Sequence, residues 1–330
     1  MYPRADRRGL LSLFAAVALV SPAVAAPSPA DDAPARVRSL KVTVLSTMLA
    51  DTKGVGEWGF AALVEADGHR LLFDTGARPE TVLKNAREMG VDLAGVTDLV
   101  LSHHHGDHTG GLLTLRRALR EENARALSRA YVGTGIFWPR PGQGGKETNE
   151  TIAMKGPDEE LGGRFVEVGK PTEVFPGAKL TGPVPRRHPD RNWSDRGQVR
   201  TVKGLVEDTL PEDMALVIDT DAGLVVVTGC GHAGVVNTVE YAREAVRAAP
   251  VHALIGGLHL FPADAAALDW TAGKLRDAGV AHLLGAHCTG VESVYTLRGG
   301  LGLDRAHCVV GAVGSGFELG RGILPSTIAR

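Results

Sequence analysis

Short apolar runs alternate with helical spacings along most of the chain. Apolar and polar residues alternate from Leu40 to Val44, which predicts a half-buried strand. The same kind of pattern predicts further strands at 60–66, 70–74, 98–102, 164–168, 178–182, 215–219, 223–228, 251–256, 281–285 and 307–311. Apolar residues at helical spacing predict helices at 82–89, 112–119, 235–248 and 268–275. Because predicted strands and helices follow one another along the chain, the pattern predicts one α/β domain over residues 38–330.

The beginning of the chain predicts an export signal. Three arginines within residues 1–8 precede an apolar run over 9–20, and an A-x-A cleavage site ends at Ala25, so residues 1–25 are predicted to be a signal peptide. The apolar run is shorter than the roughly 20 residues of a membrane-spanning helix, which argues against a stable membrane anchor. The paired arginine also resembles a twin-arginine signal. We therefore expect an exported protein, periplasmic or secreted, with a disordered leader over 26–37.

Composition narrows the class of protein and of partner. With 330 residues of which 44% are hydrophobic, the chain can bury a sizeable core, which excludes a disordered protein. Three cysteines are too few for a disulfide scaffold, and a formal net charge of −2 gives no basic surface for nucleic acid. We expect a small-molecule substrate. Residues 133–212 are dense in proline and glycine and are predicted to be a loop-rich insertion that carries substrate contacts.

The sharpest chemical signal is a cluster of histidines that follows a predicted strand. His103 and His105 lie two apart in extended chain, so both can point to one side and hold one cation, while His104 points away. Asp107 and His108 begin the next helix and can offer a second pair of ligands. Imidazole and carboxylate donors suit one or two zinc ions best, with iron or manganese as alternatives. A surface histidine tract is the bland interpretation, but this cluster ends an apolar strand and is bounded by glycines.

This H-x-H-x-D-H stretch resembles the metallo-β-lactamase fold superfamily, and the resemblance extends over most of the mature chain. It implies an α/β (α+β) fold, a four-layer αββα sandwich with metals at one edge between two sheets. The Asp74-Thr75-Gly76 turn resembles the first motif of that family. In the family this aspartate orients metal-binding side chains without touching the metal itself, and the resemblance implies this role for Asp74.

Further positions that the resemblance implies come later in the chain. Cys230 stands where the family has an aspartate that bridges two metals, and it is either a thiolate ligand or a buried small side chain. His232 is expected to supply a missing histidine ligand, and His287 fits the last ligand of the family. His259 is a candidate ligand, hydrogen-bond donor or substrate contact, and we also name it with Asp107 as a candidate catalytic residue. The pairing of Cys288 with Cys308 stays open.

The segments Gly-Cys-Gly-His-Ala-Gly, Gly-Gly-Leu-His-Leu and His-Cys-Thr-Gly narrow the resemblance to the branch that contains dihydropterin–ribofuranosylaminobenzene phosphate synthase. Our main expectation is a metal-dependent hydrolase that uses metal-activated water on an ester, lactone, amide or phosphoester. One alternative is a transferase that joins a dihydropterin to a phosphoribosyl compound, against which the export signal argues. The other alternative is a non-catalytic metal-binding protein.

Overall fold

The computed structural model describes residue 1, residues 35–188 and residues 197–329. The predicted signal peptide and residues 26–34 of the predicted leader lie outside the described part, except for Met1. Residues from Ala35 onward cluster as one compact unit. Val37 is buried and pairs with Thr220, so the folded unit includes the last residues of the expected leader.

No helix within the described ranges combines the length and the apolar character that crossing a membrane requires.

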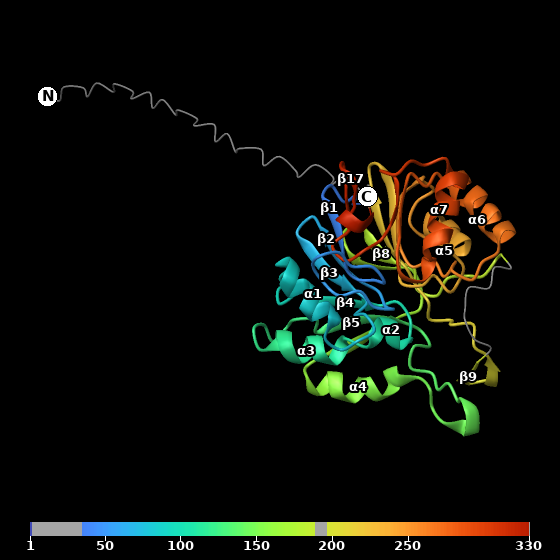
Figure 1. Cartoon of the computed structure of the whole chain (residues 1–330). Helices are drawn as coiled ribbons and strands as arrows, with labels where there is room; N and C mark the ends of the chain where they lie inside the picture. The colour runs from blue at the N-terminus through green and yellow to red at the C-terminus, as the bar shows by residue number, and fades with distance from the viewer. Residues whose placement is uncertain (2–34, 189–196, 330) are drawn as a thin grey trace. The chain divides into compact units, whose positions relative to one another are not determined.

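The first half of the chain and its C-terminal end build an eight-stranded sheet (Figure 1). In spatial order its strands are β17 (Gly322–Leu324), β16 (Gly316–Glu318), β1 (Leu40–Ser46), β2 (Ala61–Ala66), β3 (His69–Phe73), β4 (Asp98–Leu101), β5 (Arg129–Gly133) and β6 (Arg164–Val168). The strands from β17 to β3 run antiparallel to their neighbours, whereas β3 to β6 run parallel. Because β3 and β4 are parallel, the residues that follow them, Asp74 and Ser102, leave the sheet at the same edge.

A second sheet of seven strands faces the first. In spatial order it contains β15 (Cys308–Val310), β14 (His282–Gly285), β13 (Val251–Gly256), β12 (Gly223–Thr228), β11 (Leu216–Thr220), β8 (Ala178–Leu180) and β7 (Thr172–Phe175). The four strands from β12 to β15 are parallel. Their carboxyl ends therefore meet at one edge, where Cys230 follows β12 and His287 follows β14. Two further strands, β9 (Gln198–Thr201) and β10 (Gly204–Glu207), form a separate hairpin.

Helices cover the outer faces of both sheets and complete four layers (Figure 1). One face carries α1 (Thr81–Met89), α2 (Gly106–Thr109), α3 (Leu112–Arg120) and α4 (Glu150–Glu160), and the other carries α5 (Val235–Ala245), α6 (Ala265–Asp277) and α7 (Val291–Leu301). Short 3₁₀ turns lie at η1 (Gln143–Gly145), η2 (His287–Thr289) and η3 (Thr327–Ala329). The expected αββα sandwich is confirmed.

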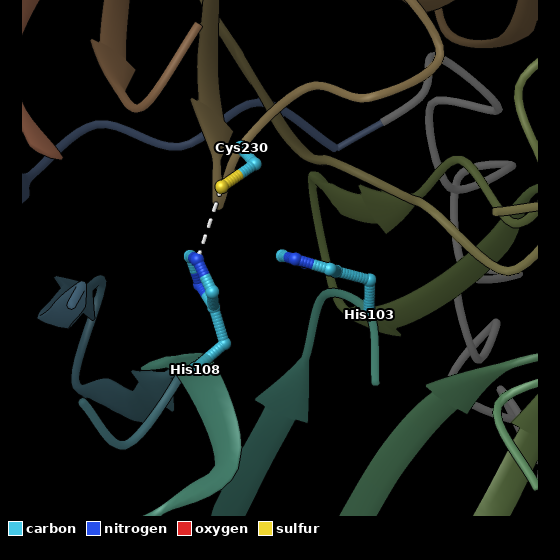
Figure 2. A group of neighbouring side chains, drawn as sticks. All are labelled: His103, His108 and Cys230. Carbon is cyan, nitrogen blue, oxygen red and sulfur yellow. Dashed lines mark hydrogen bonds between the residues drawn. The ribbon is translucent and has the colours of Figure 1, made fainter. Parts of the chain in front are cut away.

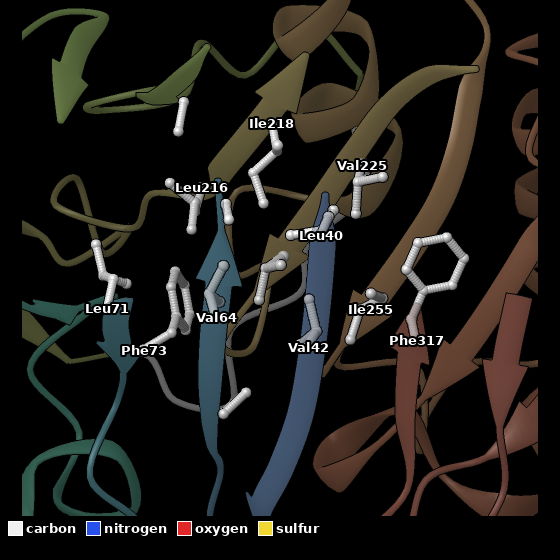
Figure 3. Packing of buried hydrophobic residues seen from close by; sticks show 14 of the residues in the cluster. Leu40, Val42, Val64, Leu71, Phe73, Leu216, Ile218, Val225, Ile255 and Phe317 are labelled. Carbon is white, nitrogen blue, oxygen red and sulfur yellow. The ribbon is translucent and has the colours of Figure 1, made fainter. Parts of the chain in front are cut away.

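The core follows from the strand patterns. Val42, Val64 and Phe73 of the first sheet pack against Leu216 and Ile255 of the second (Figure 3). Two outer apolar clusters fill the layers between each sheet and its helices. Each fully buried aliphatic or aromatic side chain contributes about 1.5–3 kcal/mol. These three layers of apolar contact hold the ends of strands from both sheets at one rigid edge.

The insertion differs from its expected form. The strands predicted at 164–168 and 178–182 are present, but they belong to different sheets, so the insertion crosses from one sheet to the other. It also contains α4, which the sequence pattern did not predict. Asn149 begins this helix by accepting a hydrogen bond from the Thr151 backbone N–H. Pro157 lies inside the helix and obscures its helical pattern.

Candidate metal centre

Five strand ends from the two sheets converge at one buried edge. His103 and His108 rise from the turn after β4, and Cys230 approaches them from the end of β12 in the opposite sheet (Figure 2). The ring centroids of His103 and His232 lie 4.7 Å apart, and those of His108 and His287 lie 5.0 Å apart. Residues more than 120 positions apart in sequence thus lie together at this edge.

Three histidines form the first group of candidate ligands. One ring nitrogen from each of His103, His105 and His232 lies within 4.8 Å of the others. Burial, followed by the neighbouring His108, lowers the pKa of His103 well below its ordinary value. Burial lowers the pKa of His105 to about 3. Both imidazoles are therefore neutral at pH 7, which is the state that donates a lone pair to a metal.

A second group combines nitrogen and oxygen donors. Ligand atoms of Asp107, His108 and His287 also lie within 4.8 Å of one another, and His287 Nε2 is 3.3 Å from Asp107 Oδ2. Burial alone would lower the pKa of His287, but Cys288 and Asp107 beside it raise that pKa to about 9. Without a metal, His287 therefore holds a proton at pH 7. A metal ion bound by His287 would displace this proton.

Cys230 lies between the two groups. Its sulfur is 3.1 Å from His108 Nε2 and is also within 4.8 Å of a ring nitrogen of His103. The side chain is 2% exposed. The sulfur of Cys230 is thus close to an imidazole of each group.

Asp74 holds two of the imidazoles in place. Its Oδ2 accepts hydrogen bonds from His108 Nδ1 at 2.7 Å and from Ser102 Oγ at 2.8 Å. A carboxylate only accepts, so His108 carries its proton on Nδ1 and directs the Nε2 lone pair into the site. Ser102 Oγ also lies 2.9 Å from His103 Nδ1, which extends the same orientation to His103. Asp74 has a φ of 59°, a strained value for a non-glycine residue, consistent with a side chain whose position matters.

The buried polar atoms fit a transition-metal ion. His103 Nε2 is buried and has no hydrogen-bond partner among the described residues, and an orphaned buried acceptor costs about 1–3 kcal/mol. A cation coordinated by this nitrogen would remove that cost. The donors gathered here are imidazole nitrogen, carboxylate oxygen and thiol sulfur, which is the ligand set of zinc sites.

A second buried network, which was not predicted from the sequence, ties the histidine turn to the insertion. His104 points away from the candidate ligands as expected, and its Nδ1 lies 2.7 Å from Glu212 Oε1. Arg140 Nη2 donates to the other oxygen of Glu212 at 2.8 Å, and Arg140 Nε donates to Asp208 at 2.6 Å. No local motif marks these residues, because their pairing depends on the path of the insertion.

Two exposed aromatic side chains form a rim beside the candidate ligands. The Trp58 and Phe261 ring centroids lie 5.5 Å apart, and both residues are about half exposed, at 49% and 48%. The ring centroid of Trp58 lies 5.0 Å from that of His287, and the ring centroid of Phe261 lies 5.2 Å from that of His259. His259 is itself buried and has a φ of 49°. Its ring centroid lies 4.5 Å from that of His232. We call Trp58 and Phe261 the aromatic rim.

All three cysteines are free, so Cys288 and Cys308 do not pair. Cys288 instead lies beside the candidate ligands, with its sulfur 3.2 Å from Cys230 Sγ. Burial and the neighbouring Cys288 raise the pKa of the Cys230 thiol. Its position directly after His287 is the one feature of the sequence that could have marked Cys288 as part of the site.

The chain belongs to the metallo-beta-lactamase superfamily, whose family description matches residues 59–244, more than half of the chain. A curated relative, 7,8-dihydropterin-6-methyl-4-(beta-D-ribofuranosyl)-aminobenzene-5'-phosphate synthase of Methanocaldococcus jannaschii, is 29% identical over 71% of this chain and 82% of its own. The expected family and branch are therefore confirmed. An uncharacterised protein of the same organism is 26% identical over 66% of this chain and 79% of its own.

Solved structures agree on the fold. The structure of Tm1679, described as a metal-dependent hydrolase of the beta-lactamase superfamily, is 26% identical with a TM-score of 0.65, over 79% of this chain and 93% of that chain. The metallo-beta-lactamase fold protein YhfI of Bacillus subtilis is 15% identical with a TM-score of 0.50, over 85% of this chain and all of that chain. The family and its enzyme members support an enzyme with a small-molecule substrate.

The curated relative corrects our main functional expectation. We predicted a hydrolase that uses metal-activated water, but the named relative that covers most of this chain is a synthase. The hydrolase prediction is therefore wrong, and the transferase alternative is better supported. The physical reason is that the histidine motif specifies where a metal is held, and a metal at such a position can assist more than one reaction.

We predict that Asp74→Asn weakens metal binding about 10–100-fold, because an amide has only one acceptor oxygen. Asp74 uses one oxygen for the Ser102 backbone N–H and the other for Ser102 Oγ and His108 Nδ1, so the amide cannot keep all three contacts that orient the imidazoles. Competition with a chelator measures the affinity. Asp98→Asn is the matched control, since Asp98 begins β4, at the opposite end of that strand from the histidine turn, and pairs with Arg129 of β5. Unchanged affinity in Asp74→Asn, or an equal loss in Asp98→Asn, would contradict this role.

Proposed function

We propose that this chain is a metal-dependent synthase that transfers a dihydropterin-6-methyl group to an aromatic amine, with an aminobenzene carrying ribose phosphate as the leading acceptor. The observation that carries the proposal is the synthase relative, which matches over 82% of its own length. The match also extends over 71% of this chain, so it is not restricted to one shared motif.

The reaction class defines what the site must do. The amine nitrogen forms a bond to the methylene carbon of the dihydropterin, while the bond from that carbon to an oxygen leaving group breaks. The oxygen departs as an anion, and the nitrogen loses a proton. The site must therefore hold a flat ring, stabilise a departing oxyanion and accept one proton.

The candidate metal ligands serve to stabilise the departing oxyanion. In the proposal His103, His105 and His232 hold one metal position, Asp107, His108 and His287 hold the other, and Cys230 lies between them. When bound, zinc or another divalent ion would act there as a Lewis acid toward the departing oxygen. Asp74 keeps the Nε2 atom of His108 turned toward this position by accepting from its Nδ1.

The aromatic rim supports a flat heteroaromatic substrate. Trp58 and Phe261 are large apolar side chains that stay half exposed beside buried candidate ligands. Exposing them to water is unfavourable unless a ligand covers them. A dihydropterin ring can stack against such a surface and gain about 0.5–1.5 kcal/mol from each aromatic contact. A ring held there lies next to the candidate metal positions, because the Trp58 ring contacts the ring of His287.

His259 is the proposed proton acceptor. It is buried beside the rim, 5.2 Å from Phe261, and its Nδ1 has no hydrogen-bond partner among the described residues. A neutral imidazole in this place can take the proton that the amine releases. Asp107, the other candidate catalytic residue, is assigned to metal binding in this proposal because its carboxylate faces His287.

The predicted export signal bears on the choice of acceptor. Residues 1–25 predict export, and biosynthetic intermediates are scarce outside the cytoplasm. The proposal therefore concerns the reaction class, and simpler aminobenzenes belong in the test beside the phosphoribosylated acceptor.

The proposal is tested by incubating metal-loaded protein with an activated 6-methylene dihydropterin and each aminobenzene, and detecting the coupled product by mass spectrometry. We expect coupling that depends on metal and is abolished in His105→Ala, which removes a proposed ligand. Release of the activating group without coupling, at the same rate with and without an amine, would overturn the synthase.

We predict that His259→Gln lowers the turnover number about 10²–10⁴-fold, the usual contribution of a general base, while metal content stays at the wild-type level. Elemental analysis and the coupling assay measure the two quantities on the same sample. If metal content falls together with turnover, His259 is a ligand instead and the proposed role is wrong.

We predict that Trp58→Leu weakens dihydropterin binding roughly 2–10-fold, because one stacking contact is lost. Fluorescence titration without amine measures this binding apart from turnover. Trp270→Leu is the control, since Trp270 is a partly exposed tryptophan of α6 that contacts His188 rather than a candidate ligand. Equal affinities in the two variants would remove the rim from the binding site.

A further inference from the structure

We propose that Cys288 is a metal ligand that joins Cys230 at the metal position of His287, making that position rich in sulfur and selective for a soft divalent cation such as Zn²⁺. The motifs of the histidine cluster give Cys288 no role. This inference concerns the metal centre alone and does not depend on which reaction the protein catalyses.

Distances bring the three donors within reach of one ion. Cys288 Sγ is 3.2 Å from Cys230 Sγ, and one donor atom of His287 lies within 4.8 Å of both sulfurs. Zinc binds sulfur at about 2.3 Å, so two thiolates on a tetrahedral zinc lie about 3.8 Å apart. Small side-chain rotations therefore suffice to bind one ion. A disulfide requires a distance of about 2.05 Å, well below the separation observed.

The fold holds Cys288 at this place by close packing. Cys230 follows β12 and Cys288 lies in η2 after β14, with β13 between these two strands. A side chain on Gly257, at the end of β13, would approach Cys288 Sγ to 2.9 Å, so the glycine leaves room for the sulfur. Thr289 accepts a hydrogen bond from the Leu258 backbone N–H at 3.0 Å and fixes the turn that carries Cys288.

The third cysteine shows what an ordinary buried thiol looks like in this protein. Cys308 packs in the apolar cluster between the second sheet and its helices. Cys230 and Cys288 are equally buried, at 2% and 1% exposed, yet they belong to none of the apolar clusters of the described residues. They contact each other, and Cys230 contacts His108. Two thiols that face imidazoles in a buried site are typical of metal ligands, whereas Cys308 is typical of core packing.

Donor softness then selects the cation. Two thiolates and one imidazole favour Zn²⁺ or Cd²⁺, whereas Mn²⁺ and Mg²⁺ prefer oxygen donors. Binding displaces the thiol protons to solvent. Imidazole and carboxylate donors alone are compatible with zinc, iron or manganese. A second sulfur donor favours zinc among these three ions.

Cobalt substitution tests the assignment on the whole protein. Co²⁺ bound to thiolate gives a charge-transfer band in the near ultraviolet, and its intensity follows the number of bound sulfurs. We expect Cys288→Ser to lose roughly half of the band, because one of two soft donors is removed. The control Cys308→Ser, which changes the cysteine of the apolar cluster, keeps the full band. Full intensity in Cys288→Ser at the same cobalt content would overturn the proposal.

Cys230→Ser keeps the test decisive if Cys288→Ser does not fold, as judged by circular dichroism. A band that remains in Cys230→Ser requires a bound Cys288 thiolate, and the absence of any band overturns the assignment. Mass spectrometry of unreduced, metal-loaded protein that finds Cys230 and Cys288 joined as a disulfide overturns it as well. Neither measurement uses turnover, so failure of the synthase assay leaves this result readable.

Discussion

The site depends on one constraint: parallel strands of two facing sheets end at the same edge. β3 and β4 of the first sheet deliver Asp74 and the histidine turn, and β12 to β14 of the second deliver Cys230 and His287. The apolar layer between the sheets fixes the distance between these ends, because close-packed cores resist small displacements. Loops can therefore be short and still bring donors together from both halves of the chain.

The edge concentrates polar groups that are costly to bury without partners. Imidazoles, thiols and carboxylates lie together with little access to water. Asp74 and Ser102 satisfy the outer nitrogens of His108 and His103, which leaves the inner nitrogens facing one another. A cation among these inner atoms would offset their desolvation. The geometry thus links three observations: strained backbone at Asp74 and His259, orphaned ring nitrogens, and sulfur atoms outside the apolar clusters.

The same site explains why the reaction was harder to predict than the ligands. A metal ligand must lie within a narrow distance of its neighbours, so spacing in the sequence reports it. The reacting group depends on what lies around the metal. In this chain that surrounding includes Trp58, Phe261 and His259, which come from different parts of the chain. The relative, and not the motif, therefore moved the interpretation from hydrolysis to group transfer.

The sequence by itself determined the strands with clear apolar periodicity, the α/β class and the histidine cluster after β4, because these depend on local pattern. The αββα arrangement was expected only from the resemblance of the H-x-H-x-D-H stretch to a known family. It did not reveal α4, whose pattern Pro157 interrupts, or the separation of the insertion between two sheets. Only the tertiary structure decided that Cys288 lies against Cys230 and that Glu212 pairs with His104. Those contacts join residues far apart in the chain, and their distances are set by sheet packing, which no local spacing encodes.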